Sequence, residues 1–240
     1  MKFVKNSAYG GVWVPDHCED KGPIKWTADT WADGMIHKVV NAVPEDRRNI
    51  ALDLGANVGM TAIGLSRYFE TVHAVEADPL TFECLEKNTE NFDNIHNHNY
   101  AVSIKDEDLK FSRVIGCSGH SHVFAGEHSN YEYITVKGKR LTEIIPENTK
   151  IDFLKIDIEG MEQFVIADNV ELLARSECVV LVEVAHAAFK SFDGLYMTLR
   201  TCGYLYATQI PGKRDFLFVH KSLARYYLAN RAPILKMTLT

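Results

Sequence analysis

Residues 53–59, with the sequence Asp-Leu-Gly-Ala-Asn-Val-Gly, combine two glycines with an acidic residue that follows later in the chain. Gly55 allows a tight turn and a close approach between backbone and ligand, and Gly59 allows a helix to pack closely on a strand. Glu76 comes 21 residues after Gly55, at the end of a second predicted strand. There its carboxylate can accept hydrogen bonds from both hydroxyls of a ribose. The glycines with the acid in register therefore predict a site for a ribose-containing ligand.

Further acidic residues lie at the ends of two later predicted strands, where they could carry acid–base chemistry. Asp157 follows a central strand, and ligands of open α/β sheets bind at the carboxyl ends of strands, which favours a functional role over that of a helix cap. For Glu159 the two roles are about equally supported. Glu183 ends a strongly apolar strand, where an unpaired carboxylate is costly to bury. His186 follows three residues later as a candidate partner or base.

Two histidine pairs, His96-x-His98 and His120-x-His122, raise the question of a metal site, because side chains at i and i+2 of a strand face the same way. No carboxylate or cysteine spacing completes either pair as a ligand set. We therefore predict no metal site. Contact of His120 and His122 with a substrate stays open as an alternative.

The elements that must position these residues alternate β-rich runs with helical stretches, which is typical of βαβ units on a parallel sheet. Predicted strands cover 49–54, 71–77, 94–103, 151–157 and 178–184, and an antiparallel hairpin follows at 204–209 and 215–220. Helices are expected at 27–43, 57–69, 79–91, 160–174 and 192–199. The pattern predicts an α/β fold whose mostly parallel, seven-stranded sheet ends in an antiparallel hairpin and carries helices on both faces.

We expect three parts along the chain. Residues 1–44 would form an N-terminal extension with a helix, in which Trp13, Trp26 and Trp31 either pack in a core or contribute to a lid. Residues 45–222 would form the main domain, with an inserted β-hairpin at about 105–137 whose strands cover 108–115 and 131–137. Residues 223–240 would form a C-terminal tail.

The composition narrows the classes of function. A net charge of −6 argues against a sequence-independent nucleic-acid binder, which relies on Lys and Arg contacts to phosphate. Uninterrupted apolar stretches are too short to cross a membrane, and no secretory signal is visible. The five cysteines are odd in number and lack a C-x-x-C pair, which favours free thiols and a cytoplasmic location.

Four segments, in this order, resemble the FkbM family of class I S-adenosylmethionine-dependent methyltransferases. They are DLGANVG (53–59), VHAVEADP (72–79), LKIDIEGME (154–162) and LVEV (181–184). The resemblance covers about residues 45–220 and implies a Rossmann-like class I methyltransferase fold with S-adenosyl-L-methionine as cofactor. Because family members usually methylate a hydroxyl or carboxyl oxygen, it also implies an O-methyltransferase.

Carried over residue by residue, the resemblance implies a role for each matching position. Asp53, Gly55, Asn57 and Gly59 would form the loop at the methionine end of the cofactor, and Glu76 would bind the ribose. The adenine would be contacted by Ala77, Asp78, Ala101 and Val102. Asp157 would face the sulfonium and the substrate. An acidic rim suits a sulfonium cation, whereas a pyrophosphate prefers walls rich in N–H groups or positive charge.

We therefore expect in-line methyl transfer to a hydroxyl of a sugar or other small molecule, with a carboxylate or histidine as general base. The candidate bases, in order, are Asp157, Glu183, His186 and Glu159. Two alternatives stay open: an NAD(P)-dependent oxidoreductase, although Asn57 departs from its glycine pattern, and a non-catalytic module that binds an adenosyl ligand. Residues 1–45 and 105–137 follow the shared pattern least and would select the acceptor, whose identity the sequence does not give.

Overall fold

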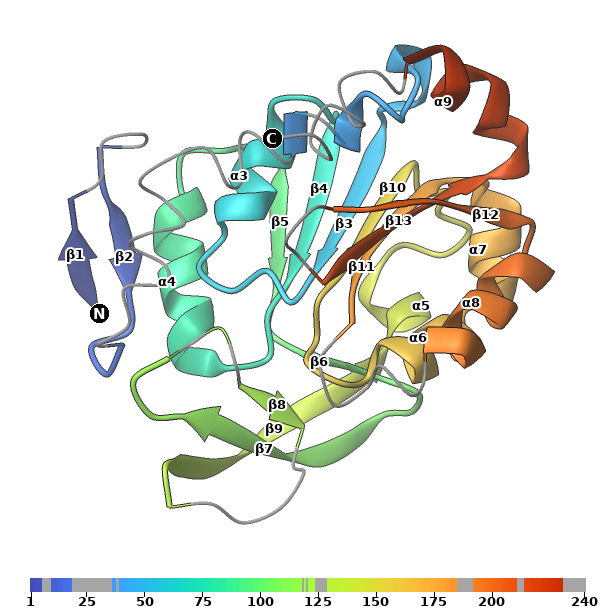
Figure 1. Cartoon of the computed structure of the whole chain (residues 1–240). Coiled ribbons are helices and arrows are strands. Elements are labelled where there is room, and N and C mark those ends of the chain that lie inside the picture. Colours follow the sequence, from blue (N-terminus) through green and yellow to red (C-terminus); the bar gives the residue numbers. More distant parts are fainter. Residues whose placement is uncertain are drawn as a thin grey trace.

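The structure, a computed structural model, describes residues 1–5, 10–18, 36–37, 39–117, 119, 121–123, 129–184, 192–210 and 214–230. Its centre is a seven-stranded sheet with helices on both faces (Figure 1). In spatial order the strands are β12 (Tyr204–Gln209), β13 (Asp215–His220), β11 (Val179–Glu183), β10 (Phe153–Ile156), β3 (Ile50–Leu54), β4 (Thr71–Val75) and β5 (Ile95–His98).

The five strands from β11 to β5 are parallel, and β13 and β12 complete the sheet as an antiparallel hairpin. This is the Rossmann-like class I methyltransferase architecture that the sequence predicts. Parallel strands are covered on both faces and read as continuous apolar runs, as β11 does with Val-Val-Leu-Val. Strand β10 lies at the centre of the sheet, next to β11.

Each face of the sheet has its own hydrophobic core. On one face, Ala51 and Phe153 pack with helices α3 (Met60–Ser66), α4 (Pro79–Thr89) and α9 (Ala224–Asn230). On the other, Leu52 and Leu54 pack with α5 (Leu141–Ile144), α6 (Glu162–Asp168), α7 (Val170–Ser176) and α8 (Phe192–Thr201). The described residues also include the short 3-10 helices η1 (Glu45–Arg47), which precedes β3, and η4 (Lys221–Leu223), which precedes α9. The predicted two-sided helical cover is therefore present.

Two predicted elements are divided in the structure. The strand expected at 94–103 ends at His98, because the chain turns at Asn99, whose side-chain amide donates to the carbonyl oxygens of Glu76 and Ala77 (2.9 and 3.3 Å). Residues 101–103 then form β6 in another sheet. The helix expected at 160–174 is α6 and α7, which meet at Asn169, where the side-chain amide donates to the carbonyl oxygen of Val165.

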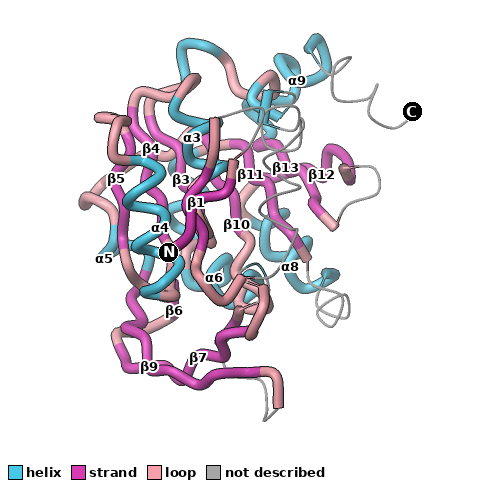
Figure 2. The backbone as a smooth tube through the Cα atoms, turned by 90° about the vertical axis from the view of Figure 1, so that its left-hand side faces the viewer, coloured by secondary structure: helices cyan, strands magenta, loops and turns pink. Residues whose placement is uncertain are grey.

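The predicted inserted hairpin is present as part of a second, four-stranded sheet. The antiparallel strands β7 (Glu107–Val114) and β9 (Tyr131–Arg140) form it with β8 (His122–Val123) and with β6 (Ala101–Ser103), in the order β6-β9-β7-β8. Figure 2 shows β6, β7 and β9 at one end of the main sheet. A small core of Ala101, Phe111 and Val136 lies within it.

A further short hairpin, β1 (Lys2–Val4) with β2 (Val12–Val14), lies against α4 (Figure 2). Its backbone is fixed by Asn88, which accepts a hydrogen bond from the N–H of Trp13 and donates one to the Trp13 carbonyl. Trp26, Trp31 and most of the predicted helix 27–43 lie outside the described residues. The proposed lid and the domain limits therefore stay predictions.

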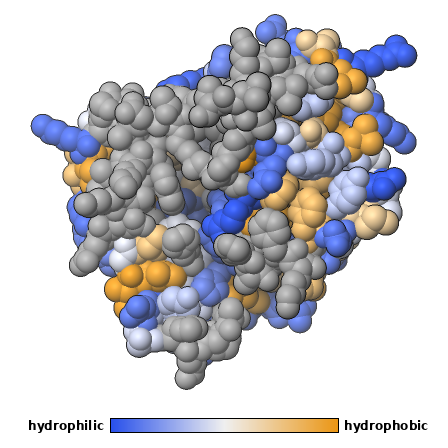
Figure 3. Space-filling model, in the orientation of Figure 1, coloured by the Kyte–Doolittle hydropathy of each residue, from blue (hydrophilic) through white to orange (hydrophobic). Residues whose placement is uncertain are grey.

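The described residues show the surface, the helices and the cysteines on which the composition bears. On the described part of the face in Figure 3, hydrophobic and hydrophilic residues are interspersed, as is usual for protein surfaces. Within the described residues, none of the helices has the length and apolar character needed to cross a bilayer. None of the five cysteines, all of which lie within the described residues, forms a disulfide.

Candidate functional site

A cavity with a volume of about 320 Å³ opens at the carboxyl ends of β3, β4, β10 and β11. Its walls come from the ends of these strands, from the start of β13 and from the second sheet. Among the predicted residues that line it are Gly55, Asn57, Glu76, Ala77, Ala101, Val102, Asp157, Glu159 and Glu183. The structure thus brings together residues that are more than 120 positions apart in the sequence.

The turn after β3 forms one wall of the cavity and depends on glycine. Gly55 has φ +79°, and its N–H and that of Ala56 both donate to the Val75 carbonyl at 2.9 Å. A Cβ at position 55 would lie 1.7 Å from the Asp157 carbonyl oxygen, so no side chain fits there. Gly59 does not line the cavity; it begins α3 with φ +95° and packs on Leu85 and Thr89 of α4. The two glycines serve the turn and the helix packing that the sequence predicts.

Glu76 is held by backbone N–H groups on both carboxylate oxygens. Its Oε2 accepts from Asn57 and its Oε1 from Asp78, each at 2.9 Å. Burial raises the pKa of Glu76 to about 7, and the two N–H groups act in the opposite direction. Each oxygen keeps a further lone pair for a hydroxyl donor. The carboxylate is therefore held in an orientation that suits two hydroxyl donors of a ligand.

The end of the cavity beside Ala77 is apolar and includes residues that the sequence did not point to. Ala77, Ala101 and Val102 line it as predicted, and Phe111 of β7 and Val123 of β8 face it from the second sheet. These side chains form a wall suited to a flat aromatic ring. The inserted sheet thus lines part of the cavity, and its predicted role in acceptor selection stays a prediction.

Asp78 does not line the cavity, in contrast to its predicted contact with adenine. Its carboxylate accepts two hydrogen bonds from the Arg113 guanidinium, at 2.7 Å from Nε and 2.6 Å from Nη2, and caps α4 by accepting from the Leu80 N–H. Both side chains of the ion pair are buried. Asp78 therefore fastens the second sheet to the loop that carries Glu76 and Ala77.

Lys155 of β10 occupies the floor of the cavity and was missed by the sequence analysis. Its Nζ lies 3.2 Å from Asp53 Oδ1, 3.3 Å from Asp157 Oδ2 and 3.3 Å from the Gly55 carbonyl oxygen. Asp53 is fully buried beneath it and does not line the cavity. A lysine on a central strand is rarely buried unless it is paired. Its place within an apolar predicted strand could therefore have indicated a buried ion pair.

At the other end of the cavity, carboxylates predominate. Glu183 pairs with Arg214, with Oε1 and Nη2 3.0 Å apart, whereas Glu159 has no hydrogen-bond or ion-pair partner among the described residues. Burial and the nearby Asp157 raise the pKa of Glu159 to about 8 and that of Glu183 to about 7. Nothing in the sequence pointed to Arg214, which precedes β13. This end can hold and exchange a proton near neutral pH.

The loop that carries Glu159 has a fixed and unusual backbone. Glu159 has φ +53°, in the left-handed region that residues other than glycine seldom adopt. Glu162, which is buried, stabilises this conformation by accepting hydrogen bonds from the N–H groups of Ile158 and Gly160 at 3.0–3.1 Å. Backbone strain of this kind is concentrated at functional sites. It supports a functional role for Glu159 over that of a simple cap.

None of the predicted histidines within the described residues lines this cavity. His186 and His120 lie outside the described residues, and His122 of β8 contacts the Tyr131 ring edge-on. His96 and His98 share one face of β5, and His73 of β4 lies beside both, with His73 Nδ1 3.0 Å from His98 Nε2. Within the described part of the chain, no group of three His, Cys, Asp or Glu side chains has the geometry of a metal site.

The sheet order, the Gly55 turn and the Glu76 carboxylate together define a class I methyltransferase with a Rossmann-like fold. A family model, the methyltransferase FkbM domain, matches residues 53–206, which is more than half of the chain. The chain therefore belongs to the FkbM methyltransferase family. This membership does not support the oxidoreductase alternative, and S-adenosyl-L-methionine is the cofactor.

Two known methyltransferases are similar to this chain. "Methyltransferase 1" of Beauveria bassiana (strain ARSEF 2860) is 24% identical over 156 residues, which cover 55% of this chain and 63% of that protein. The crystal structure of methyltransferase FkbM from Methylobacillus flagellatus KT superposes with a TM-score of 0.53 at 16% identity, covering 72% of this chain and 44% of that one. The chain thus spans less than two thirds of either relative, and the second likeness shows the fold alone.

Proposed function

We propose that this protein transfers the methyl group of S-adenosylmethionine to a hydroxyl oxygen of a sugar or another small molecule. The observation that carries the proposal is a single cavity with two chemically different ends. Glu76 and the apolar wall are suited to the adenosine of the cofactor, and Asp157, Glu159 and Glu183 line the same cavity. A hydroxyl group at the acidic end would thus lie in the same enclosed space as the cofactor.

When bound, the cofactor supplies an electrophilic methyl group on a positively charged sulfur. The chain's own residues would align the acceptor oxygen with that methyl group, and alignment can contribute on the order of 7–11 kcal/mol to lowering a barrier. As the oxygen–carbon bond forms and the carbon–sulfur bond breaks, the hydroxyl proton passes to a general base. A neutral thioether, the methylated acceptor and a protonated base result.

Glu159 is the strongest candidate for that base, followed by Glu183. The carboxylate of Asp157, which the sequence favours, is engaged by Lys155, and that of Glu183 by Arg214. Glu159 faces the cavity without such a partner, and its raised pKa, about 8, suits a base that works near neutral pH. His186 remains a candidate from the sequence.

The charges at the acidic end favour a neutral or positively charged acceptor. Asp157, Glu159 and Glu183 line it, and Lys155 and Arg214 are each already paired with a carboxylate. At neutral pH the raised pKa leaves Glu159 largely protonated. A carboxylate or phosphate group would still meet repulsion from the ionised carboxylates, because like charges placed together disfavour binding. The proposal therefore covers hydroxylated compounds such as neutral or amino sugars, and excludes nucleic acid.

The first test is titration calorimetry of the purified protein with S-adenosylmethionine, S-adenosylhomocysteine and NAD(H). We expect micromolar binding of the two adenosyl ligands and a loss of at least about tenfold in Glu76→Ala, because a charged hydrogen-bonding partner of the ribose is removed. Glu90→Ala, which removes an exposed glutamate of the Lys87 ion pair, is the matched control and should bind as the wild type does. Binding of NAD(H) alone would contradict the proposal.

An acceptor screen with isotopically labelled methyl groups tests the second half of the proposal. Neutral glycosides, amino sugars, uronic acids, small carboxylic acids and RNA are offered in parallel. We expect labelling of neutral or amino hydroxyl compounds, and a fall in turnover of about 10²–10⁴ in Glu159→Gln with little change in cofactor affinity. Labelling of only RNA or acids would refute the acceptor class, and full turnover in Glu159→Gln would remove Glu159 as base.

A further inference from the structure

Lys155 is an almost completely buried cation with three oxygen neighbours. Strands β3 and β10 are parallel, and Lys155 stands directly opposite Asp53 in their register. The ammonium lies within 3.3 Å of one oxygen each of Asp53, Asp157 and Gly55, and only 3% of the residue's surface is exposed. One cation is thus shared between two carboxylates, of which Asp157 lines the cavity and Asp53 does not.

The arrangement is expensive as a purely structural device. Asp53 is fully buried, and within the described structure neither of its oxygens has a partner with the geometry of a hydrogen bond. A buried ion pair seldom stabilises a fold more than apolar residues of similar size would, because both charges lose their hydration. The pair therefore calls for an explanation outside the packing of the sheet.

Lys155 is also unsuited to direct chemistry. Burial by itself would lower the pKa of its ammonium group, but Asp53 and Asp157 outweigh that effect and raise the pKa above its ordinary value. The nitrogen keeps its proton and has no free lone pair at neutral pH. Lys155 is therefore unsuited to act as a base or nucleophile. What it contributes to the site is the positive charge of its ammonium group.

We propose that Lys155 is a positioning residue that offsets one of the two negative charges of Asp53 and Asp157, so that this trio would present one net negative unit to a sulfonium bound in the cavity. The two carboxylates would bring two negative charges to the cavity floor, and the ammonium brings one positive charge. A single negative unit stabilises the positively charged sulfonium but not the neutral thioether of the product. The arrangement would therefore favour S-adenosylmethionine over S-adenosylhomocysteine. The proposal depends on the cofactor assignment and not on the identity of the acceptor.

The test compares the affinities of the two ligands, measured by calorimetry, in variants that change the local charge. Asp53→Asn brings the net charge of the trio at positions 53, 155 and 157 to zero. The ratio of affinities should then shift toward S-adenosylhomocysteine by on the order of tenfold. The double variant Asp53→Asn with Lys155→Met restores one negative unit and should return the ratio of affinities to within about twofold of the wild type. Burial raises the pKa of Asp53 and Lys155 acts against this effect. In Lys155→Met alone that opposing charge is lost, so the ratio of affinities should depend on pH.

A merely structural role would weaken both ligands equally and leave their ratio unchanged. The proposal is wrong if Asp53→Asn keeps the wild-type ratio, or if the double variant fails to restore it. Circular dichroism and thermal melting establish that each variant is folded, and the double variant avoids an unpaired buried charge. Asp152→Asn is the matched control: it removes a buried aspartate at the opposite end of the same two strands. Failure of the wild type to bind either ligand would instead refute the cofactor.

Discussion

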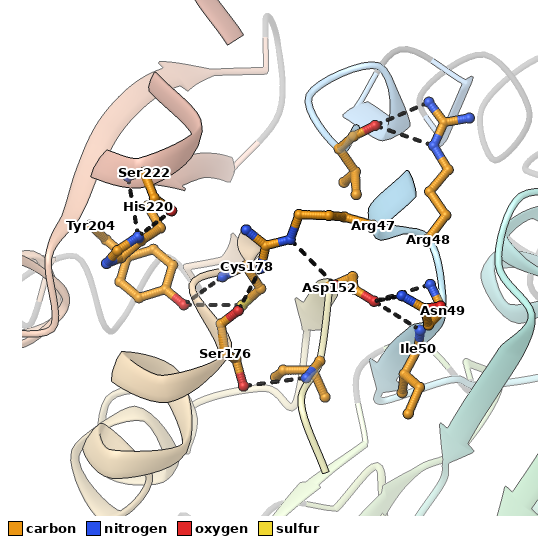
Figure 4. A network of polar contacts seen from close by, with 12 residues as sticks. Arg47, Arg48, Asn49, Ile50, Asp152, Ser176, Cys178, Tyr204, His220 and Ser222 are labelled. Carbon is orange, nitrogen blue, oxygen red and sulfur yellow. Dashed lines mark hydrogen bonds and ion pairs between the residues drawn. The ribbon is translucent and has the colours of Figure 1, made fainter. Parts of the chain in front are cut away.

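The two ends of the β3–β10 strand pair hold buried aspartates in opposite ways. At the amino end, Asp152 Oδ2 accepts hydrogen bonds from the backbone N–H groups of Asn49 and Ile50 and from the Asn49 side chain, at 3.0–3.2 Å (Figure 4). Arg47 stands 3.7 Å away and also donates to the Ser176 carbonyl. At the carboxyl end, Asp53 has the Lys155 charge but no hydrogen bond of good geometry.

This difference separates stability from function within one pair of strands. A carboxylate that accepts several N–H groups is satisfied, and it joins the strands between which it lies. A carboxylate balanced only by a neighbouring charge remains responsive to any further charge that enters the site. The amino end is therefore built for holding the sheet together, and the carboxyl end for recognising a ligand.

The largest effect is expected from Gly55→Ala at the carboxyl end. The new Cβ would collide with the Asp157 carbonyl oxygen in a backbone conformation with φ +79°. We expect a loss of about 4 kcal/mol or more in unfolding free energy and no measurable cofactor binding. Gly59→Ala is the comparison, because its Cβ meets chiefly the flexible Leu85 side chain and should cost less. Equal losses in chemical denaturation would show that the turn is not special.

Asp152→Ala should give the next largest effect, and on stability alone. It leaves the partly buried backbone N–H groups of Asn49 and Ile50 without their acceptor, which should cost about 1–3 kcal/mol of unfolding free energy. The ratio of affinities for S-adenosylmethionine and S-adenosylhomocysteine should remain that of the wild type. Urea denaturation and calorimetry measure the two quantities. A changed ratio would show that the two ends are not independent.

Glu159→Gln should have the smallest effect on stability, with the opposite sign. The folded-state pKa of Glu159, about 8, lies above the ordinary 4.5, so the unfolded chain gives up this proton at lower pH than the folded one does. The wild type consequently loses stability as pH rises from about 4.5 to 8. The glutamine variant should equal the wild type near pH 4.5 and exceed it by about 1–2 kcal/mol above pH 8, after allowance for solvent screening. A variant less stable than the wild type at pH 8.5 in thermal melts would contradict this.

Much of the main sheet could be predicted from sequence, because its strands and helices follow regular apolar patterns. The β3 and β11 runs and the Asp78-Pro79 start of α4 carry strong local signals, and the structure confirms them. The hairpin of β1 and β2 was not predicted, since strands of three residues show no periodicity. The break after His98 also escaped, because it depends on the contacts of Asn99 with residues 76 and 77.

The candidate site was predictable where one segment contains its own geometry, and not where it depends on distant partners. The Gly55 turn and Glu76 belong to compact segments with fixed spacing. Phe111, Lys155 and Arg214 act through neighbours that only the fold supplies, and Asp78 is diverted by Arg113, which lies 35 residues away. The roles of the site residues in catalysis remain predictions that the variants above address.

The separation of β6 from β5 has a thermodynamic consequence. Because the chain changes sheets at this point, the cavity lies along the junction of two sheets, with Ala101 and Phe111 on one side and Gly55 and Val75 on the other. A ligand that touches both sides opposes their separation, and reciprocity requires the docked second sheet to strengthen ligand binding by the same free energy. Ligand binding in the cavity should therefore slow the exchange of the amide hydrogens of β7 and β9 with solvent.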